Sequence, residues 1–422
     1  MLSSALRVLV RALRGASQRR SLTCRQLVYE NYGDPLKVLK LKSIGIPEKL
    51  EAKEIRVKWM AAPINPADIN QVQGVYPIKP PLPAVGGSEG FAEVEAVGAG
   101  VSDLKVGDWV VAAHSGLGCW RTHAIYAEED VVRIEKDLPF EAAATFQVNP
   151  PTAYRMLKDF VHLRPGDLVV QNGANSAVGR AVIQIAHARR LRTVNMVRNR
   201  SNISELIAEL KSLGADEVFT EEQMLKETKG KAKGAKLALN CVGGRSALTL
   251  ASCLANKGVM VTYGGMSKQP IQVPTASLIF KDIKLVGFWM SHWYTFPEHK
   301  PQRDEMFREL AELVRSGRFK TPHFQRVKLD DWQQAITDAL SSSVPTASLI
   351  FKDIKLVGFW MSHWYTFPEH KPQRDEMFRE LAELVRSGRF KTPHFQRVKL
   401  DDWQQAITDA LSSSVKKQLF VY

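Results

Sequence analysis

The middle of the chain carries the clearest pattern of apolar and polar positions. An apolar run at residues 168–170 leads into a turn of small and polar residues at 171–179. Apolar residues then recur at helical spacing to about Arg190, and a run rich in β-branched residues follows at 193–197. The pattern predicts a strand, a tight turn, a helix and a second strand, which form the βαβ unit of a parallel sheet.

The turn of this unit suits the binding of a pyrophosphate. Small side chains allow the backbone to approach the phosphates, and the helix that begins near Ser176 directs unpaired N–H groups at their negative charge. The G-x-G-x-x-G pattern is met only in part, because Ala174 and Ser176 occupy the first two glycine positions and only Gly179 is kept. The turn alone therefore indicates a dinucleotide site only weakly.

The residues after the second strand indicate which dinucleotide is bound. NAD sites usually place an acid there to hold the ribose hydroxyls, whereas this chain has Arg198, Asn199 and Arg200. Two guanidinium groups suit a 2′-phosphate and leave bare ribose hydroxyls without an acceptor. The segment therefore favours NADPH over NADH; the alternative is a solvated basic loop.

Short apolar runs separated by Gly and Pro turns precede the βαβ unit. The runs at residues 55–59, 90–97, 109–112 and 131–134 predict strands of a β-rich domain of about 120 residues. The fold class is therefore α/β, with a β-rich domain followed by a doubly wound Rossmann domain.

The C-terminal part of the chain is repeated. Residues 273–343 recur without a single change as residues 344–414, a period of 71 residues. Solenoids contain three or more diverged units with distinct ends, so two identical copies do not indicate one. The repetition indicates either a recent tandem duplication or an error in the assembly of the sequence. The nearer copy is expected to complete the Rossmann sheet, because the shorter connection costs less loop entropy.

Length and composition agree with a soluble protein of two domains. The chain has 422 residues, of which 45% are hydrophobic, enough for two buried cores. It has no run of eighteen apolar residues, so no membrane span is expected. Its four cysteines, at positions 24, 119, 241 and 253, form no C-x-x-C pair and indicate neither a zinc lobe nor a disulfide framework.

The start of the chain predicts a targeting segment. Six arginines and no acid occur before Glu30, and Arg7, Arg11 and Arg14 share one helical face. Residues 1–24 are therefore interpreted as a mitochondrial presequence, which would direct the protein to the matrix. Arginines interrupt the only apolar core that a secretory signal would need, and a disordered basic start is the alternative.

The formal net charge of +14 raises the alternative of a nucleic-acid-binding protein. The lysines between residues 226 and 236 are the densest basic run, but no aromatic residue is interleaved with them. Solvated lysines are the simpler interpretation, so nucleic acid is not expected as a partner.

The order of the domains resembles the medium-chain dehydrogenase/reductase superfamily, as do Gly-Asp-Trp-Val at 107–110 and Pro-Gly-Asp at 165–167. In the zinc-dependent branch, a cysteine ligand precedes the position of Asp68 and a histidine precedes that of Glu89. This chain has Asn-Pro-Ala-Asp and Gly-Ser-Glu there, so both metal ligands are missing. The resemblance implies no metal and a shift toward reducing activated C=C bonds, as in quinone and enoyl reductases.

Within the zinc-free branch, the chain resembles the mitochondrial 2-enoyl thioester reductase family from about Arg25 to Tyr422, once one repeat copy is set aside. Matching motifs include Ala-Pro-Ile-Asn-Pro (62–66), Gln-Gly-Val-Tyr-Pro (73–77), Leu-Asn-Cys-Val-Gly-Gly (239–244) and Val-Thr-Tyr-Gly-Gly-Met (261–266). The resemblance implies a homodimer that uses NADPH to reduce trans-2-enoyl thioesters of acyl carrier protein or coenzyme A in mitochondrial fatty acid synthesis.

The resemblance also assigns a site. Tyr76 corresponds to the catalytic tyrosine of the family. The matching cofactor-binding positions are Asn149, Asn175, Ser176, Ala177, Val178, Arg198, Asn199, Arg200, Tyr263, Gly264, Gly265, Met266, Phe288, Trp289, Met290, Ser291 and Lys417. Ala177 replaces the usual glycine, which matters only if the residue needs a positive φ. Asn149 would orient the nicotinamide or its ribose, unless it caps a helix that starts at Thr152.

A phenol at position 76 suits this reaction. Addition of hydride to the β-carbon of an enoyl thioester places charge on the thioester oxygen, and a proton must then reach the α-carbon. Tyr76 can supply that proton and hydrogen-bond the enolate. The nearest alternative is a quinone reductase of the same branch, which would need no proton donor at Tyr76.

The two repeat copies are expected to have different roles. The end of the second copy adjoins the unique tail, so it is expected to return to the catalytic domain, leaving surplus residues with exposed apolar groups such as Trp332 and Phe351. The predicted segments are a presequence (1–24), a GroES-like catalytic domain (25–149), a Rossmann domain (150–292), a surplus segment and connection (293–397) and a C-terminal return (398–422).

Overall fold

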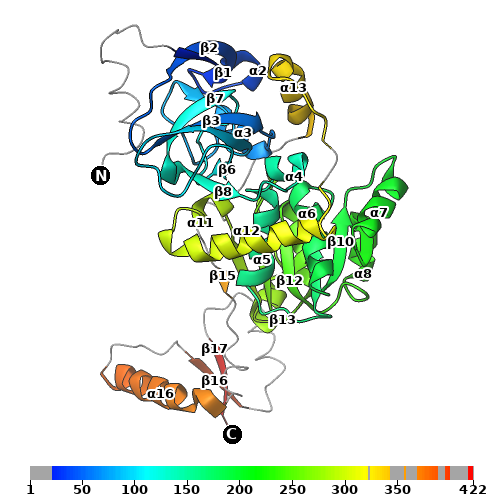
Figure 1. The fold of residues 1–422 in the computed structure, drawn as a ribbon. Helices are drawn as coiled ribbons and strands as arrows, with labels where there is room; N and C mark the ends of the chain where they lie inside the picture. Colours follow the sequence, from blue (N-terminus) through cyan, green and yellow to red (C-terminus); the bar gives the residue numbers. More distant parts are fainter. Residues whose placement is uncertain are drawn as a thin grey trace. The chain divides into compact units, whose positions relative to one another are not determined.

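The computed structural model describes residues 21–321, 324–342, 356–357, 368–387, 395–399 and 417–421. The chain divides into two units, Met1–Phe359 and Trp360–Tyr422. The first unit contains a β-rich domain, blue to cyan in Figure 1, and a Rossmann domain, green to yellow. Most of the predicted presequence (1–24) lies outside the described residues, but its last four residues belong to strand β1 (Ser21–Tyr29).

The β-rich domain consists of two antiparallel sheets, with the strand orders β2-β1-β4 and β7-β3-β5-β6-β8. In β3 the buried residues Ile55, Val57 and Trp59 alternate with more exposed ones, so one face of the sheet covers a core. All four strands predicted from apolar runs are present, as β3, β5, β6 and β8. The elements after β1 are α2 (Pro35–Val38), β2 (Leu39–Pro47), β3 (Glu54–Ala61), α3 (Pro66–Val72), β4 (Ala84–Val85), β5 (Phe91–Val97), β6 (Trp109–Ala112), β7 (His123–Ala127), β8 (Val131–Ile134) and α4 (Phe140–Ala144).

The Rossmann domain is built on a parallel sheet of strand order β11-β10-β9-β12-β13-β14, which confirms the predicted fold class. Strand β9 is buried along its whole length, as expected for a central strand covered on both faces. The elements are α5 (Asn149–Asp159), β9 (Leu168–Gln171), α6 (Ala177–Ala188), β10 (Arg192–Val197), α7 (Ile203–Ser212), β11 (Glu217–Thr220), α8 (Glu221–Glu227), β12 (Ala235–Asn240), α9 (Gly244–Cys253), β13 (Leu254–Thr262), α10 (Thr275–Phe280), β14 (Lys284–Gly287), α11 (Met290–Trp293) and α12 (Lys300–Arg315). No described helix combines the length and apolar character of a membrane span.

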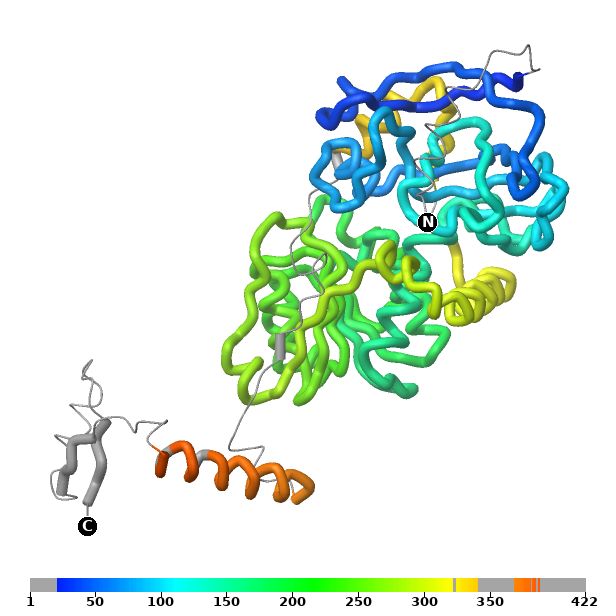
Figure 2. Tube along the Cα trace, turned by 90° about the vertical axis from the view of Figure 1, so that its left-hand side faces the viewer, coloured from blue at the N-terminus to red at the C-terminus, as the bar shows by residue number. Residues whose placement is uncertain are grey.

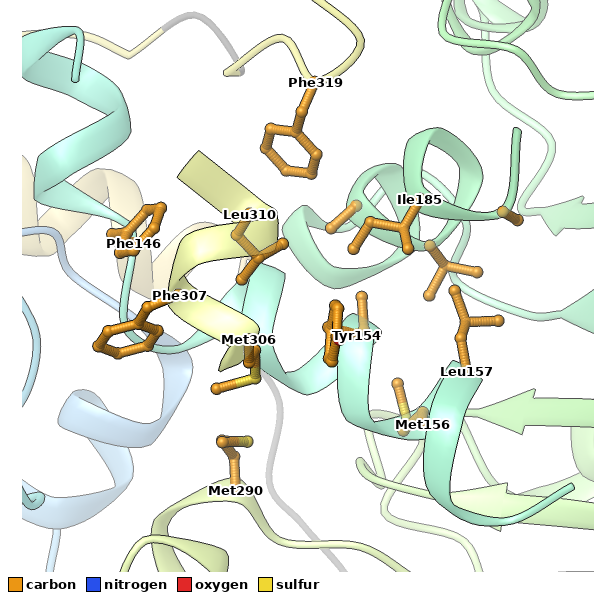
Figure 3. Packing of buried hydrophobic residues seen from close by; sticks show 14 of the residues in the cluster. Phe146, Tyr154, Met156, Leu157, Ile185, Met290, Met306, Phe307, Leu310 and Phe319 are labelled. Carbon is orange, nitrogen blue, oxygen red and sulfur yellow. The ribbon is translucent and has the colours of Figure 1, made fainter. Parts of the chain in front are cut away.

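Three helices that pack on this sheet share one core. Tyr154 and Met156 of α5 are fully buried, and they cluster with Ile185 of α6 and with Met306 and Leu310 of α12 (Figure 3). Close packing of large side chains leaves little room for α5 to shift. The packing therefore fixes the N-terminus of α5, where Asn149 lies.

The nearer repeat copy completes both domains of the first unit. Strand β14 pairs with β13, as expected. Helix α13 (Trp332–Ser342) lies against the β-rich domain (Figure 2). Its Ile336 is 1% exposed and clusters with Leu27 and Tyr29 of β1. Trp332, predicted to be exposed in a surplus segment, is half-buried against the same cluster.

Residues 400–416 and 422 of the predicted C-terminal return (398–422) lie outside the described residues, so the return stays a prediction. Strand β17 (Lys417–Val421) pairs in parallel with β16 (Phe395–Lys399) in the second unit, which also contains α16 (Lys371–Arg386). Residues 324–328 have the sequence of β16 but form no strand, because their tail partner occurs only once. Phe351 lies outside the described residues.

Candidate functional site

The loop between β9 and α6 has the geometry of a phosphate-binding turn. Ser176 is the N-cap of α6, and its hydroxyl accepts a hydrogen bond of 3.1 Å from the Gly179 N–H. A Cβ at Gly179 would lie 2.6 Å from the Ala174 carbonyl oxygen, so only glycine fits there. Gly173 has a φ of +58°, and a Cβ there would lie 2.4 Å from the Cys241 Sγ. Sequence reasoning missed Gly173, because it looked for glycine at Ala174 and Ser176.

Ala177 does not need to be a glycine. It is the first residue of α6, and it is not among the residues with positive φ. The loss of the family's usual glycine therefore causes no backbone strain.

The loop after β13 lies beside this turn. The Met266 N–H donates a hydrogen bond of 2.9 Å to the Cys241 carbonyl, and a Cβ at Gly264 would lie 2.9 Å from the same oxygen. The half-buried Tyr263 side chain lies beside Ser176, and burial of its hydroxyl raises the pKa of Tyr263 well above its usual value. The predicted residues 263–266 and the N-terminus of α6 thus come together at the carboxyl ends of the strands, where ligands of such sheets bind.

The basic segment after β10 contains an unsatisfied group. Arg198 and Asn199 are exposed, whereas Arg200 is half-buried. The Arg200 Nε–H is buried and has no hydrogen-bond partner in the part of the chain that the structure describes. An unpaired buried donor costs about 1–3 kcal/mol. A phosphate oxygen would satisfy it, so the segment fits a 2′-phosphate.

Tyr76 lies where the two domains of the first unit meet. The Trp289 Nε1–H donates a hydrogen bond of 2.8 Å to the Tyr76 hydroxyl oxygen, and the rings meet edge to face at 5.9 Å. The Ser291 side chain forms a second hydrogen bond with Tyr76 that lowers the Tyr76 pKa, and a bond that favours the phenolate is one in which Ser291 donates. Burial raises the pKa of Tyr76, and the hydrogen bonds from Ser291 and Trp289 partly offset that rise. The phenol is therefore protonated at neutral pH and held by two donors that would stabilise its anion.

The segment around Trp289 alternates between site and core. Trp289 and Ser291 contact Tyr76, whereas Phe288 and Met290 are only 8% and 5% exposed within the core. The Phe288 ring lies 5.5 Å from that of Phe160. Phe288 precedes α11, and Met290 is its first residue. Since both side chains are used in packing, the cofactor contacts predicted for Phe288 and Met290 stay predictions.

A buried carboxylate supports Asn149. Glu89 accepts hydrogen bonds from the Val148 N–H at 2.8 Å and from the Asn65 Nδ2 at 2.7 Å. The Asn65 Oδ1 accepts from the Asn149 Nδ2 at 3.4 Å. Helix α5 begins at Asn149, so the alternative that Asn149 caps a helix at Thr152 is wrong. Sequence reasoning used Glu89 only to mark a missing metal ligand.

Glu89 makes stability depend on pH. Burial raises the pKa of Glu89 to about 7, above its unfolded value of about 4.3. Its protonated form therefore stabilises the fold at low pH, and this contribution is lost as the pH rises through about 7. We expect the unfolding free energy of Glu89→Gln to increase relative to that of the native chain between about pH 5 and pH 8. Denaturant titration across this range measures the difference.

A change at the exposed Glu129, Glu129→Gln, provides the control, and its difference from the native chain should stay constant with pH. A constant difference for Glu89→Gln as well would contradict the expectation. Burial raises the pKa of Asp68 to about 6, and its charge contributes to the raised pKa of Glu89, so the measured difference includes the coupling between these two acids.

The remaining candidate groups add little to the site. Among residues 21–321, 324–342 and the later described segments, no group of three or more His, Cys, Asp or Glu side chains could hold a metal ion. Lys417 lies in β17 of the second unit, so its predicted phosphate contact stays a prediction. In the basic run, Lys231 pairs with Glu217 at 2.7 Å and Lys236 with Asp167 at 2.8 Å. These ion pairs reduce the charge that the run offers to a nucleic acid.

Comparisons with known proteins cover both domains. Residues 51–136 match the family described as "Alcohol dehydrogenase GroES-like domain", and residues 177–302 match the family described as "Zinc-binding dehydrogenase". The mitochondrial enoyl-[acyl-carrier-protein] reductase of Caenorhabditis elegans is 56% identical over 332 residues, which are 79% of this chain and 96% of that protein.

Two solved structures extend the comparison to the fold. The Etr1p/Etr2p heterodimer, a mitochondrial 2-enoyl thioester reductase from Candida tropicalis, has a TM-score of 0.69 and 34% identity over 80% of this chain and 99% of that one. The complex of Etr1p with NADP and crotonyl-CoA has a TM-score of 0.70 and 34% identity, with the same coverage of 80% and 99%.

Proposed function

Because the chain belongs to the family of mitochondrial enoyl-[acyl-carrier-protein] reductases, we propose that it reduces the C=C bond of trans-2-enoyl thioesters with NADPH. The thioester is carried by acyl carrier protein or coenzyme A, and the reaction serves fatty acid synthesis in the mitochondrial matrix. The observation that carries the proposal is the position of Tyr76, which is held by Trp289 and Ser291 where the β-rich and Rossmann domains meet. A protonated phenol there suits a reaction that ends in protonation of carbon.

Different groups carry out the hydride transfer, the proton transfer and the stabilisation of charge. NADPH, when bound, supplies a hydride to the β-carbon of the enoyl group. Tyr76 gives its proton to the α-carbon, so the product gains one hydride and one proton in place of the C=C bond. The donors from Trp289 and Ser291 stabilise the phenolate that remains.

The cofactor is proposed to lie across the carboxyl ends of β9, β10 and β13. The N-terminus of α6, capped by Ser176, faces the pyrophosphate, and Arg198 and Arg200 bind the 2′-phosphate. Asn149, oriented by Asn65 and Glu89, lies at the domain junction and contacts the nicotinamide end. In this proposal the pyrophosphate, the 2′-phosphate and the nicotinamide end of NADPH would each bind a different group of the chain.

Steady-state kinetics tests the proposed function. We expect NADPH oxidation with a trans-2-enoyl-CoA substrate and little with a simple quinone. Efficient quinone reduction without thioester reduction would assign the chain to the quinone reductases instead. Retention on RNA without NADPH oxidation would favour the nucleic-acid-binding alternative.

We further propose that a single-copy form of this chain is a homodimer joined at the edge strand β14. In this chain β14 pairs antiparallel with β15 (Leu356–Val357), and Leu285 lies opposite Leu356, its own counterpart in the repeat. A strand that pairs with its own copy in this register has local two-fold symmetry, which is the symmetry of a homodimer interface. The second copy thus occupies an edge that would otherwise be open to another chain.

Deletion of residues 344–414 tests this proposal. The deletion removes β15 and leaves the unique tail. We expect the shortened protein to sediment as a dimer and the full chain as a monomer at the same concentration. Equal masses for the two forms would contradict the role given to β15.

A further inference from the structure

A row of hydroxyl groups leads to Tyr76 from the β-rich domain. The Ser115 Oγ–H, in the loop after β6, donates a hydrogen bond of 2.7 Å to the Ser291 Oγ in α11. The Ser291 hydroxyl in turn donates to the Tyr76 oxygen. Three segments that are distant in sequence therefore form one hydrogen-bonded chain across the domain junction.

The direction of these hydrogen bonds suits proton delivery. Ser115 donates to Ser291, and Ser291 donates to Tyr76 when the phenol is ionised, because a phenolate can only accept. The Trp289 Nε1–H also points at the same oxygen. The hydrogen bonds from Trp289 and Ser291 end at the Tyr76 oxygen and do not use the phenolic proton. That proton is the one that the proposed reaction transfers to the substrate. An indole N–H cannot give up its proton, whereas a hydroxyl can pass one on.

The outer end of the row lies close to solvent. Ser115 is only partly buried, and the side chain of its neighbour His114 is 43% exposed. The His114 ring contacts the Ser115 carbonyl oxygen at 3.3 Å and the Asp130 carboxylate at 3.2 Å. The His114 ring therefore lies beside the row, and its contact with Ser115 is to the carbonyl oxygen and not to the hydroxyl.

We propose that Ser115 and Ser291 form a proton relay that restores the proton of Tyr76 after each turnover, an inference that rests on the proposed enoyl reductase function. When Tyr76 has given its proton to the α-carbon, the Ser291 O–H bond breaks and a new O–H bond forms at the phenolate. Ser115 gives its proton to the Ser291 oxygen, and water replaces the proton of Ser115. No group is oxidised or reduced in these steps.

The relay makes Ser115 and Ser291 positioning residues whose loss should affect proton delivery. We expect Ser291→Ala to lower kcat for reduction of a trans-2-enoyl-CoA about 10-fold, less than the roughly 10²–10⁴-fold contribution of a direct general acid, because water can still return the proton to Tyr76. The solvent deuterium isotope effect on kcat should rise, because restoring the proton becomes rate-limiting. The KM for the thioester should change little, and Ser291→Thr, which keeps the hydroxyl, should recover most of the loss. Ser115→Ala should show the same changes with a smaller loss of kcat.

A second measurement needs neither cofactor nor substrate. The pKa of Tyr76 can be read from the tyrosinate absorbance of each protein after subtraction of the matching Tyr76→Phe protein. We expect Ser291→Ala to raise that pKa, because a donor to the phenolate is lost. Ser252→Ala, in α9, removes a hydroxyl that is bonded to the Leu248 carbonyl, and it should change neither the pKa nor the isotope effect.

The outcomes separate the relay from the function on which it rests. If the native chain reduces the thioester but the isotope effect is unchanged in both alanine variants, the relay is overturned and the function stands. If the loss appears in KM rather than kcat and Ser291→Thr does not restore it, the two serines act structurally and the relay is also overturned. If the native chain does not reduce the thioester, the proposed function fails and the relay falls with it.

Discussion

Replacement of Tyr76 by phenylalanine is expected to lower kcat for a trans-2-enoyl thioester by about 10²–10⁴-fold, the usual contribution of a positioned general acid. The change removes the hydroxyl that accepts hydrogen bonds from Trp289 and Ser291 and keeps the ring that packs against the indole. Binding of NADPH should therefore be almost unchanged. Initial rates at saturating cofactor and thioester measure the effect.

Tyr154→Phe is the matched control for this variant. Tyr154 is also buried, and its hydroxyl accepts a hydrogen bond of 3.1 Å from Lys158 in the same helix. Its loss should leave kcat within about two-fold of the native value, because surface-linked hydrogen bonds contribute little. A native kcat in Tyr76→Phe would show that another group protonates the α-carbon.

The second large effect is expected when both guanidinium groups after β10 are removed. A hydrogen bond to a charged group contributes about 1.5–3 kcal/mol, or roughly 10–100-fold in affinity. The variant Arg198→Ala/Arg200→Ala should therefore raise the KM for NADPH by about 10²-fold or more and leave the KM for NADH almost unchanged. The native preference for NADPH would be lost.

Arg192→Ala provides the control, because Arg192 is an exposed arginine at the opposite end of the same strand. It should preserve the preference for NADPH. If the double variant also kept that preference, the 2′-phosphate would have to bind elsewhere, and the unpaired Arg200 Nε–H would need another explanation.

Local sequence patterns predicted the elements that carry the site. The βαβ unit was expected from apolar runs at 168–170 and 193–197, and strands β9 (Leu168–Gln171) and β10 (Arg192–Val197) contain them. These runs are buried on both faces, so their hydrophobicity is continuous and easy to recognise. Phe288 and Met290 are buried in the core, whereas a family resemblance assigns all four residues 288–291 to the cofactor without separating core from site.

Two features could not be predicted from local pattern. Identical repeat copies have identical propensities, so only chain connectivity decides that the first copy supplies α13 and the second supplies the partner of β17. The pairing of Glu89 with Asn65 joins residues 24 positions apart through a buried hydrogen bond. Nothing in the residues around Glu89 indicates whether an acid there is solvated or enclosed.

The central claim is that hydride from NADPH and a proton from Tyr76 add to the two carbons of an enoyl thioester. Reduction of trans-2-butenoyl-CoA by 4-deuterated NADPH in ordinary water, and by unlabelled NADPH in deuterium oxide, tests it most directly. We expect deuterium from NADPH only at the β-carbon of the product and deuterium from the solvent only at the α-carbon. The reaction in deuterium oxide should be nearly abolished in Tyr76→Phe. Absence of reduced thioester, or label at the reversed positions, would contradict it.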